Sequence, residues 1–479
     1  MTPVTTLEVA VVGSGPAGIY TAEALIKQVA ALAPAGTVRV DVLDQLPTPY
    51  GLVRYGVAPD HPSIRSIADY LRGVLEHPDV RFLGGVHLGD DVTRDDLLAS
   101  YDAVVYATGA MRDRRMGIPG EDLPGSYAAT DFVNWYCGHP DMSMDMFALD
   151  AESVAVIGVG NVAVDVARIL VRDPAELRPT DVPQPVLETL MASKVRDVHV
   201  IGRRGAAQAK FTTKELRELG ELSGVDILVD PAEVDSVVSD PAGLSALAAE
   251  TDRRVRGNLA VIRGWADRAP AGDVRRLTVR FWLRPEQIEG TQRVSGLTVE
   301  RTRLDETGVL TGTGELETIP VQMVLRSVGY QSVPLPGVPF DEITATVPNS
   351  EGRVLGPDGA PLPGEYVAGW LKRGPTGVIG TNKSDAAASV RSLLSDCAGD
   401  GGAEREDAAQ PGDAAQPGDS GRQALEDLLA ARGVAPVSYA DWLRVERAEA
   451  ALAGELGRGA RVKLPGREAL ESVCRPPFS

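Results

Sequence analysis

The sequence predicts an α/β fold that contains two Rossmann-like β-α-β units, and three observations support this. First, an apolar strand at residues 7–12 leads through a glycine turn into a helix at 21–32, and a β-branched strand follows at 38–43. Second, the same order of strand, glycine turn and helix restarts at residues 154–171, and its next strand is expected at 198–202. Third, a length of 479 residues is enough for two or three domains.

Further elements follow in chain order. A strand is expected at residues 101–107, further strands of the second unit at 277–281, 297–301 and 321–328, and a helix at 386–394. Composition then changes, because residues 398–422 are rich in Gly, Ala, Asp and Pro and contain a tandem hexapeptide repeat at 407–418. Such a segment buries too little apolar area to offset its ordering entropy, so a flexible linker is predicted. Beyond it, helical spacing at 423–431 and 438–456 predicts a C-terminal helical extension over 423–479.

Composition and charge narrow the function classes. Hydrophobic residues make up 43% of the chain and charged residues 24%, as in globular proteins. The net charge of −19, from 48 Lys+Arg and 67 Asp+Glu, argues against a general nucleic-acid binder. Cys137, Cys397 and Cys474 form no Cys-x-x-Cys motif, which argues against an iron–sulfur cluster, a zinc ribbon or a dithiol pair. We expect no targeting segment and no membrane span, and a reducing, cytoplasmic location.

The first glycine turn has the Gly-x-Gly-x-x-Gly pattern of a dinucleotide site, with Gly13, Gly15 and Gly18 between a strand and a helix. Gly13 permits the tight turn, Gly15 lets a pyrophosphate approach the backbone, and Gly18 lets the helix pack closely on the strand. The helix N-terminus then offers N–H donors and a positive dipole end to phosphates. Asp44, at the end of the next strand, is placed to accept hydrogen bonds from an adenosine ribose.

The second glycine turn contains Gly158 and Gly160, with Ala163 in the third glycine position. Its next strand ends in Arg203 and Arg204 rather than in an acid. Two guanidinium groups there suit the 2′-phosphate of NADP, whereas a carboxylate would suit the ribose of NAD. A pair of solvated surface arginines is the alternative interpretation.

Two dinucleotide sites in one chain indicate a flavin and a nicotinamide, because one cofactor can then donate a hydride and the other accept it. The glycine-rich segment 374–380, followed by a helix, fits this interpretation. Its backbone N–H groups and the helix dipole are suited to stabilise negative charge on a reduced flavin, although such a segment alone is more often only a turn.

Five stretches together resemble one family. They are residues 11–18, 51–62, 160–168, 201–205 and 369–379. In these stretches the sequence closely resembles the adrenodoxin reductase type of ferredoxin–NADP reductase, including its bacterial members. The resemblance extends over residues 7–394, with a weaker match over 442–464.

The resemblance implies a fold in which an NADP domain is inserted into a discontinuous FAD domain. The implied bounds are 1–112 and 330–397 for the FAD domain and 113–329 for the NADP domain. The residues that it places against FAD are Ala17, Asp44, Leu52, Leu88, Trp370, Gly377, Val378 and Ile379, in addition to Gly13, Gly15 and Gly18 of the first turn. Those that it places against NADP are Val159, Gly160, Asn161, Val162, Arg203, Arg204, Glu215 and Gly377, in addition to Gly158 of the second turn. His61 and Asp165 match positions considered for proton handling near the flavin, although a loop-ordering or helix-capping role explains them equally well.

The activity that the resemblance implies is hydride transfer from NADPH to FAD, followed by single-electron transfer to a ferredoxin that supplies a cytochrome P450 or similar oxygenase. Ferredoxins are acidic, so docking on this acidic chain requires a concentrated basic face. Arg253, Arg254 and Arg256 are the main candidates for it. Additional candidates are Lys210, Lys214, Arg275, Arg276, Arg280 and Arg284.

Two residues depart from the family pattern. Val159 stands where relatives usually carry a polar Asn or Gln, which predicts weaker NADPH binding, and Asp44 replaces the more usual Glu. Alternatives to the ferredoxin reductase also stay open. They include an NADPH-dependent flavoprotein that acts directly on a small molecule, the reductase subunit of another complex such as a glutamate synthase, and a non-catalytic nucleotide sensor. The absence of Cys-x-x-Cys and of a Cys-rich N-terminal domain argues against a disulfide reductase and a glutamate synthase subunit.

Overall fold

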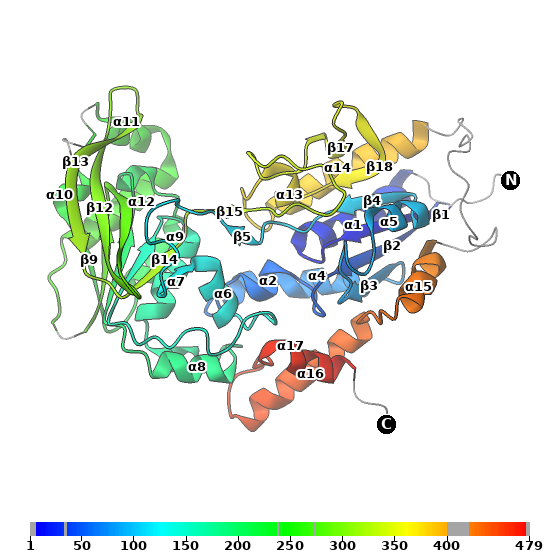
Figure 1. The fold of residues 1–479 in the computed structure, drawn as a ribbon, viewed down its shortest axis with the longest axis horizontal. Coiled ribbons are helices and arrows are strands. Elements are labelled where there is room, and N and C mark those ends of the chain that lie inside the picture. The colour runs from blue at the N-terminus through cyan, green and yellow to red at the C-terminus, as the bar shows by residue number, and fades with distance from the viewer. Residues whose placement is uncertain are drawn as a thin grey trace.

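Two sheets, one mixed and one parallel, lie in the two halves of the molecule and organise the fold in the computed structural model (Figure 1). The structure describes residues 6–32, 36–236, 239–240, 242–272, 274–399 and 421–475. We call the body built on the seven-stranded sheet the first lobe and the body built on the six-stranded sheet the second lobe.

The first lobe is built from two stretches of chain that are far apart in sequence. Its sheet has the order β16-β17-β18-β4-β1-β2-β3, in which β18, β4, β1, β2 and β3 run parallel. The strands are β1 (Thr6–Val12), β2 (Thr37–Asp44), β3 (Val80–Gly84), β4 (Ala103–Tyr106), β16 (Asn349–Ser350), β17 (Arg353–Leu355) and β18 (Pro361–Val367). The helices are α1 (Pro16–Leu32), α2 (Leu52–Tyr55), α3 (Pro62–Arg65), α4 (Ile67–Leu75), α5 (Arg94–Ser100), α13 (Trp370–Arg373) and α14 (Thr381–Gly399).

The second lobe lies between these two parts in sequence. Its parallel sheet has the order β6-β14-β7-β8-β10-β9, and an antiparallel sheet β11-β12-β13 accompanies it. The strands are β6 (Ser126–Ala128), β7 (Ser153–Ile157), β8 (Asp197–Ile201), β9 (Val225–Val229), β10 (Arg275–Arg280), β11 (Leu283–Gly290), β12 (Val294–Leu304), β13 (Leu310–Ile319) and β14 (Met323–Arg326). The helices are α6 (Ala129–Tyr136), α7 (Asn161–Val171), η1 (Pro174–Leu177), α8 (Gln184–Met191), η2 (Ala206–Gln208), α9 (Thr213–Gly220), α10 (Pro231–Val234), α11 (Leu244–Thr251) and α12 (Arg253–Ala266).

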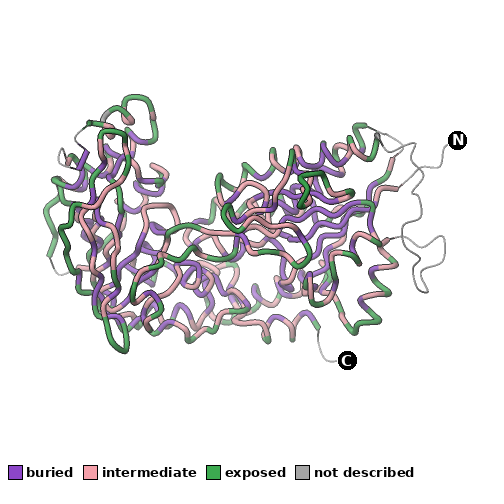
Figure 2. Tube along the Cα trace, turned by 45° about the horizontal axis from the view of Figure 1, so that its top comes forward, coloured by how far each residue is buried: buried purple, intermediate pink, exposed green. Residues whose placement is uncertain are grey.

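The predicted fold class is therefore confirmed, with two β-α-β lobes of which one is assembled from separated stretches of chain. Buried β-branched residues explain why the strands form, since Val9, Val11, Val40 and Val42 are all fully buried between the helix layers. Figure 2 shows the same pattern, with buried backbone along the central strands and exposed backbone along the outer helices. Helix α1 begins at Pro16, earlier than expected, because proline is favoured in the first turn of a helix.

The chain passes twice between the lobes through a short antiparallel pair. Strands β5 (Arg112–Asp113) and β15 (Tyr330–Gln331) form this two-stranded sheet, in which Asp113 pairs with Tyr330. In Figure 1 both strands lie between the lobes. We call this pair the hinge.

The C-terminal extension consists of α15 (Gly421–Ala431), α16 (Tyr439–Glu455) and α17 (Gly466–Cys474). Ser438 begins α16 with a capping box in which its side chain and that of Asp441 bond each other's backbone N–H. In Figure 1 the extension runs beneath the first lobe and reaches α8 of the second. Of the predicted linker, residues 398–399 belong to α14 and 421–422 to α15, while 400–420, including the tandem repeat, lie outside the described residues. None of the helices in the described ranges combines the length and apolar character that crossing a membrane requires.

Candidate functional site

The first glycine turn joins β1 to α1, and each of its glycines has a separate reason to be there. Gly13 has φ of 112°, and a Cβ there would lie 2.6 Å from the carbonyl oxygen of Ala107 in the crossover after β4. A Cβ on Gly18 would overlap the carbonyl oxygen of Gly13. A Cβ on Gly15 would have no atom within 4 Å. The turn therefore packs tightly at Gly13 and Gly18 and leaves open space at Gly15, where a phosphate can approach.

Asp44 lies at the end of β2, and its carboxylate is bonded to the same turn. Its Oδ2 accepts hydrogen bonds from the backbone N–H (2.7 Å) and the hydroxyl (2.6 Å) of Ser14, and its Oδ1 accepts one from Leu46 N–H (2.9 Å). Burial raises the pKa of Asp44, and these hydrogen bonds oppose the rise. Oδ1 keeps acceptor capacity for a ribose hydroxyl, because a carboxylate oxygen has more than one lone pair.

Two loops from distant parts of the chain meet at this turn. A Cβ on Gly51 would lie 3.0 Å from Gly15 Cα, and a Cβ on Gly369 would lie 2.5 Å from the Cβ of Ala17. Both glycines have positive φ, of 47° and 75°. The predicted FAD residues Ala17, Leu52 and Trp370 stand in or next to these loops, so the structure brings them together.

Trp370 and the remaining residues predicted to contact FAD lie in three different places. Trp370 stacks on Tyr330 of the hinge, with ring centroids 5.7 Å apart and planes inclined by 29°, and its indole N–H donates to Thr376 O (3.1 Å). Gly377 and Ile379 belong to the glycine-rich turn before α14, with Val378, whose side chain is largely exposed. Leu88, by contrast, is buried in the core on the other side of the first sheet.

The second glycine turn repeats the arrangement between β7 and α7. Gly158 has φ of 131°, and a Cβ there would overlap the carbonyl oxygen of Ser327 after β14, while a Cβ on Gly160 would have no atom within 4 Å. Neighbouring groups hold the turn in place. Val159 O accepts from Lys210 N–H (2.8 Å), and Asn161 Oδ1 accepts from the N–H of Thr212 (2.9 Å). Val162 follows in the first turn of α7. Both turns thus offer a helix N-terminus and an open glycine, which fits a dinucleotide at each.

Arg203 and Arg204 follow β8 and differ from several other arginines of this lobe. Both are exposed, and neither side chain makes an ion pair with any residue in the described part of the chain. Arg276 instead pairs with Asp197. Arg280 pairs with Glu233 and Glu317, and Arg284 pairs with Glu286 and Glu300. Two unpaired guanidinium groups beside the second turn are suited to a phosphate anion.

His61, Asp165 and Glu215 form a buried cluster at the contact between the lobes. His61 begins α3 of the first lobe, and its Nε2 lies 3.1 Å from both Asp165 Oδ1 on α7 and Glu215 Oε2 on α9. Burial lowers the pKa of His61, but the two carboxylates outweigh this and raise it to about 9, with Arg168 opposing them. Glu215, which was expected to contact NADP, therefore has its carboxylate turned to His61 in this structure.

Two members of this cluster were missed from the sequence. Arg168 Nη2 lies 2.6 Å from His61 Nε2 and donates to Asp165 Oδ1 (2.7 Å), and its Nε donates to Asp60 Oδ2 (2.6 Å). The sequence carries a signal, because Asp165 and Arg168 are three residues apart on one helix and Asp60 precedes His61. The pairing across lobes is visible only in the fold.

The predicted docking arginines lie at the N-terminus of α12. Arg253, Arg254 and Arg256 are all exposed, while Arg254 also donates to Ala209 O (2.8 Å) and lies 3.6 Å from Asp252. Their exposure leaves them available to an acidic surface. The additional candidates Arg276, Arg280 and Arg284 are instead neutralised by their ion pairs.

Known proteins resemble this chain over nearly its full length. A family model described as pyridine nucleotide-disulphide oxidoreductase matches residues 7–262. NADPH-ferredoxin reductase FprA of Mycobacterium tuberculosis is 44% identical over 460 residues, which cover 95% of this chain and 96% of that protein. The mitochondrial NADPH:adrenodoxin oxidoreductase of Homo sapiens is 38% identical, covering 93% of this chain and 88% of that protein.

Solved structures agree with these matches. Mycobacterium tuberculosis FprA in complex with NADPH has a TM-score of 0.88 and 42% identity, and the match covers 98% of this chain and 99% of that one. The family resemblance seen in the motifs is thus confirmed. The chain belongs to the pyridine nucleotide-disulphide oxidoreductase family, in the group that contains the NADPH–ferredoxin and NADPH:adrenodoxin reductases.

Proposed function

We propose that this chain is an FAD-dependent oxidoreductase that takes a hydride from NADPH and passes single electrons to a ferredoxin. The observation that carries the proposal is the pair of glycine turns with different polar groups beside them. Asp44 lies beside the first turn, where its carboxylate can accept hydrogen bonds from a ribose. Arg203 and Arg204 lie beside the second turn, where their guanidinium groups can bind a 2′-phosphate. The names of the relatives, which are NADPH–ferredoxin and NADPH:adrenodoxin reductases, support the same assignment.

The chain's own residues would bind and orient the two cofactors. Gly15 and the N-terminus of α1 would receive the FAD pyrophosphate, and Asp44 the adenosine ribose. Gly160 and the N-terminus of α7 would receive the pyrophosphate of NADPH. Arg203 and Arg204 would bind its 2′-phosphate. When bound, FAD supplies the chemistry that accepts electrons as a pair and releases them singly.

His61 would hold a proton at Nε2 between Asp165 and Glu215 at neutral pH, because its pKa is raised to about 9. We propose that this group orders the contact between the lobes and hence the approach of the two cofactors. Hydride transfer itself needs orientation rather than a general acid or base.

The partner would be an acidic ferredoxin that docks on Arg253, Arg254 and Arg256. These arginines are exposed at one end of α12, so they present positive charge without first breaking a strong internal pair. The reduced ferredoxin would supply electrons to a cytochrome P450 or similar oxygenase. The protein would be located in the cytoplasm. The buried thiols Cys137 and Cys474 suit a reducing compartment.

Ferredoxin-dependent reduction of cytochrome c tests the proposal. The FAD-loaded protein is given NADPH or NADH, with and without a small ferredoxin, and cytochrome c reduction is followed. Strong stimulation by ferredoxin and a preference for NADPH are expected. Flavin reduction without stimulation would instead assign direct chemistry on a small molecule.

Docking is tested with Arg254→Glu, for which Arg276→Glu is a matched control because Arg276 is already paired with Asp197. Arg254→Glu is expected to raise the KM for ferredoxin and to weaken its dependence on salt. Indifference of turnover to both the substitution and salt would contradict docking at this surface.

A further inference from the structure

The loop between α16 and α17, residues 456–465, contacts the second lobe although the helices on both sides of it pack on the first. Arg458 donates to Arg178 O (3.0 Å) and Thr180 O (3.1 Å), which lie between η1 and α8, and to Gln184 Oε1 (3.1 Å) at the start of α8. Gly459 packs directly on Pro179, because a Cβ there would overlap the carbonyl oxygen of Pro179. We call residues 456–465 the latch.

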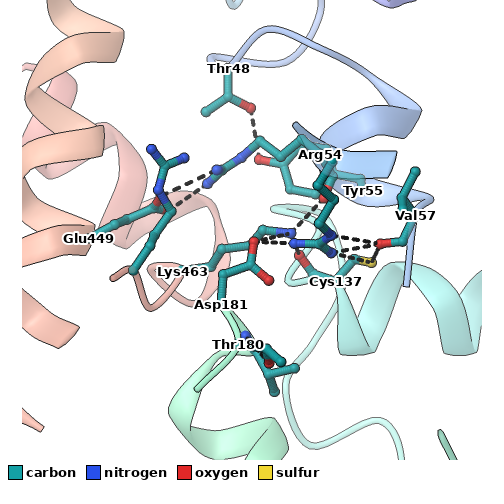
Figure 3. Close-up of polar contacts among 12 residues, drawn as sticks. Thr48, Arg54, Tyr55, Val57, Cys137, Thr180, Asp181, Glu449 and Lys463 are labelled. Atoms are coloured by element: carbon teal, nitrogen blue, oxygen red, sulfur yellow. Dashed lines mark hydrogen bonds and ion pairs between the residues drawn. The ribbon is translucent and has the colours of Figure 1, made fainter. Parts of the chain in front are cut away.

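Lys463 is the centre of the latch and is 1% exposed. Its Nζ donates to Arg54 O of the first lobe (2.5 Å) and to Cys137 O of the second (2.8 Å). The same Nζ lies 3.5 Å from Asp181 Oδ2, and the backbone N–H of Lys463 donates to Asp181 O (3.0 Å). One ammonium group therefore joins α2 to two segments of the second lobe, as Figure 3 shows.

The charge of Lys463 fits these partners. Burial lowers its pKa to about 8, and Asp181 opposes the fall, so the amine is mostly protonated at neutral pH. Its three hydrogens then match two carbonyls and one carboxylate. A buried cation is costly unless every donor has a partner, so the site favours the arrangement in which all three segments are in place.

The latch is anchored in the first lobe by a second buried pair. Arg54 donates from Nη1 to Glu449 Oε2 (3.2 Å) and from Nη2 to Glu449 Oε1 (2.5 Å), and neither side chain is more than 4% exposed. Glu449 on α16 also accepts from Leu464 N–H in the latch (3.2 Å). The Arg54 guanidinium lies 4.8 Å from the ring centre of Trp442 on the same helix. The first-lobe end of the latch is therefore held at several points.

The latch and the hinge restrain the same movement from different places. The hinge strands β5 and β15 carry the chain between the lobes, whereas the latch reaches the second lobe at α8, and Figure 1 shows these two places apart. Arg65 of α3 adds a further link, because it pairs with Asp181 and donates to Val57 O (2.6 Å). A rotation about the hinge would separate Lys463 from Asp181 and Cys137.

We propose that the latch fixes the relative orientation of the two lobes, with Lys463 as its positioning residue. The inference rests on the proposed function, since a nicotinamide held by the second lobe must meet a flavin held by the first. Reacting groups lose rate steeply when misplaced by about 1 Å. The C-terminal extension, remote in sequence from both glycine turns, thereby acts on hydride transfer.

The test compares Lys463→Met with Arg422→Met in the full-length, FAD-loaded protein. Met keeps the length of the side chain and removes its donors. Arg422 is the matched control, because it ties α15 to the backbone of Val40 and Asp79 in the first lobe alone. The distance between the lobes is read by single-molecule energy transfer between labels at Asp95→Cys and Gln287→Cys, with the exposed Cys397 changed to Ser.

Lys463→Met is expected to broaden or shift the distribution of distances between the lobes, and Arg422→Met to leave it as in the parent protein. Flavin reduction by NADPH is expected to slow by about 10- to 100-fold with FAD content unchanged. Lys463→Arg, which keeps the charge, is expected to recover part of the rate. If Lys463→Met does not fold, Arg458→Met gives the same comparison, because it removes only bonds from the latch to the second lobe.

An unchanged distance distribution together with an unchanged rate of flavin reduction in the latch variants would overturn the proposal. A slower rate with an unchanged distribution would also overturn it, since Lys463 would then act without fixing the lobes. Failure of the parent protein to be reduced by NADPH would refute the proposed function instead. The distance measurement needs no turnover and still decides whether the latch holds the lobes.

Discussion

His61 Nε2 lies 3.1 Å from Asp165 Oδ1, although the two residues are 104 positions apart and belong to different lobes. With Arg168 bonded to Asp60 and Asp165, a buried network of charges crosses the contact between the lobes. The network exists only when the lobes are assembled in this orientation. Its properties therefore report on the assembled state.

The first prediction concerns the pH dependence of stability. The folded protein raises the pKa of His61 from 6.5 to about 9, so the folded state binds the proton more tightly than the unfolded state does. The stabilisation is fully present below pH 6.5 and is lost as the pH rises through 9. We expect the stability advantage of the parent protein over His61→Gln to shrink by about 1–2 kcal/mol between pH 6 and pH 9.5.

Urea unfolding at a series of pH values measures this advantage. His87→Gln is the control, because the His87 side chain is half exposed. An advantage over His61→Gln that stays constant or grows with pH would show that His61 is not held protonated by its carboxylate neighbours.

The second prediction concerns the choice of nicotinamide. Arg203→Ala and Arg204→Ala are each expected to raise the KM for NADPH by about 10-fold or more, because a hydrogen bond to a charged group contributes about 1.5–3 kcal/mol. The KM for NADH, which lacks the 2′-phosphate, is expected to change little. Steady-state kinetics with both nucleotides measure this, with Arg276→Ala as the paired-arginine control. Equal losses with NADPH and NADH would place the phosphate elsewhere.

The third prediction concerns Val159 in the second glycine turn. Its side chain packs at Gly202, where an added Cβ would lie 2.8 Å from Val159 Cγ1, so it offers the nucleotide no hydrogen bond. Val159→Asn is expected to lower the KM for NADPH by about 5- to 10-fold, the gain from one new hydrogen bond of about 1 kcal/mol. A KM that is unchanged or higher would contradict the interpretation that a polar contact is missing there.

The fourth prediction separates the roles of two glycines in the first turn. Gly15→Ala meets no atom of the chain, so the apoprotein should keep its stability to within about 0.5 kcal/mol while FAD affinity falls at least about 10-fold. Gly13→Ala forces a side chain into positive φ against the Ala107 carbonyl, and the apoprotein should lose about 1–3 kcal/mol. Thermal unfolding of the apoproteins and FAD titration measure both. Equal loss of apoprotein stability in the two variants would contradict this division.

The turns could be predicted from sequence because their chemistry is local. Gly13, Gly15 and Gly18 lie within six residues, and the apolar strand before them indicates where the turn begins. Arg203 and Arg204 could be placed for the same reason, at the end of a predicted strand. The discontinuous first lobe needed the family resemblance, since the pairing of β18 with β4 brings together residues more than 250 positions apart.

The latch could not have been found that way. In the sequence, Glu449 resembles an ordinary charge on a solvated helix and Lys463 an ordinary charge on a loop, and their partners Arg54 and Asp181 lie hundreds of positions away. Only the folded chain shows that these charges are buried and paired. The same reason explains why Arg280 looked available for docking, although Glu233 and Glu317 neutralise it.

The central claim is that a hydride from NADPH leaves this protein as single electrons on ferredoxin. Anaerobic titration of the FAD-loaded protein with NADPH, in the presence of excess oxidised ferredoxin, tests it most directly. Because a hydride carries two electrons, the account predicts that two one-electron ferredoxins are reduced for each NADPH oxidised. Oxidation of NADPH with the ferredoxin left oxidised would contradict the account.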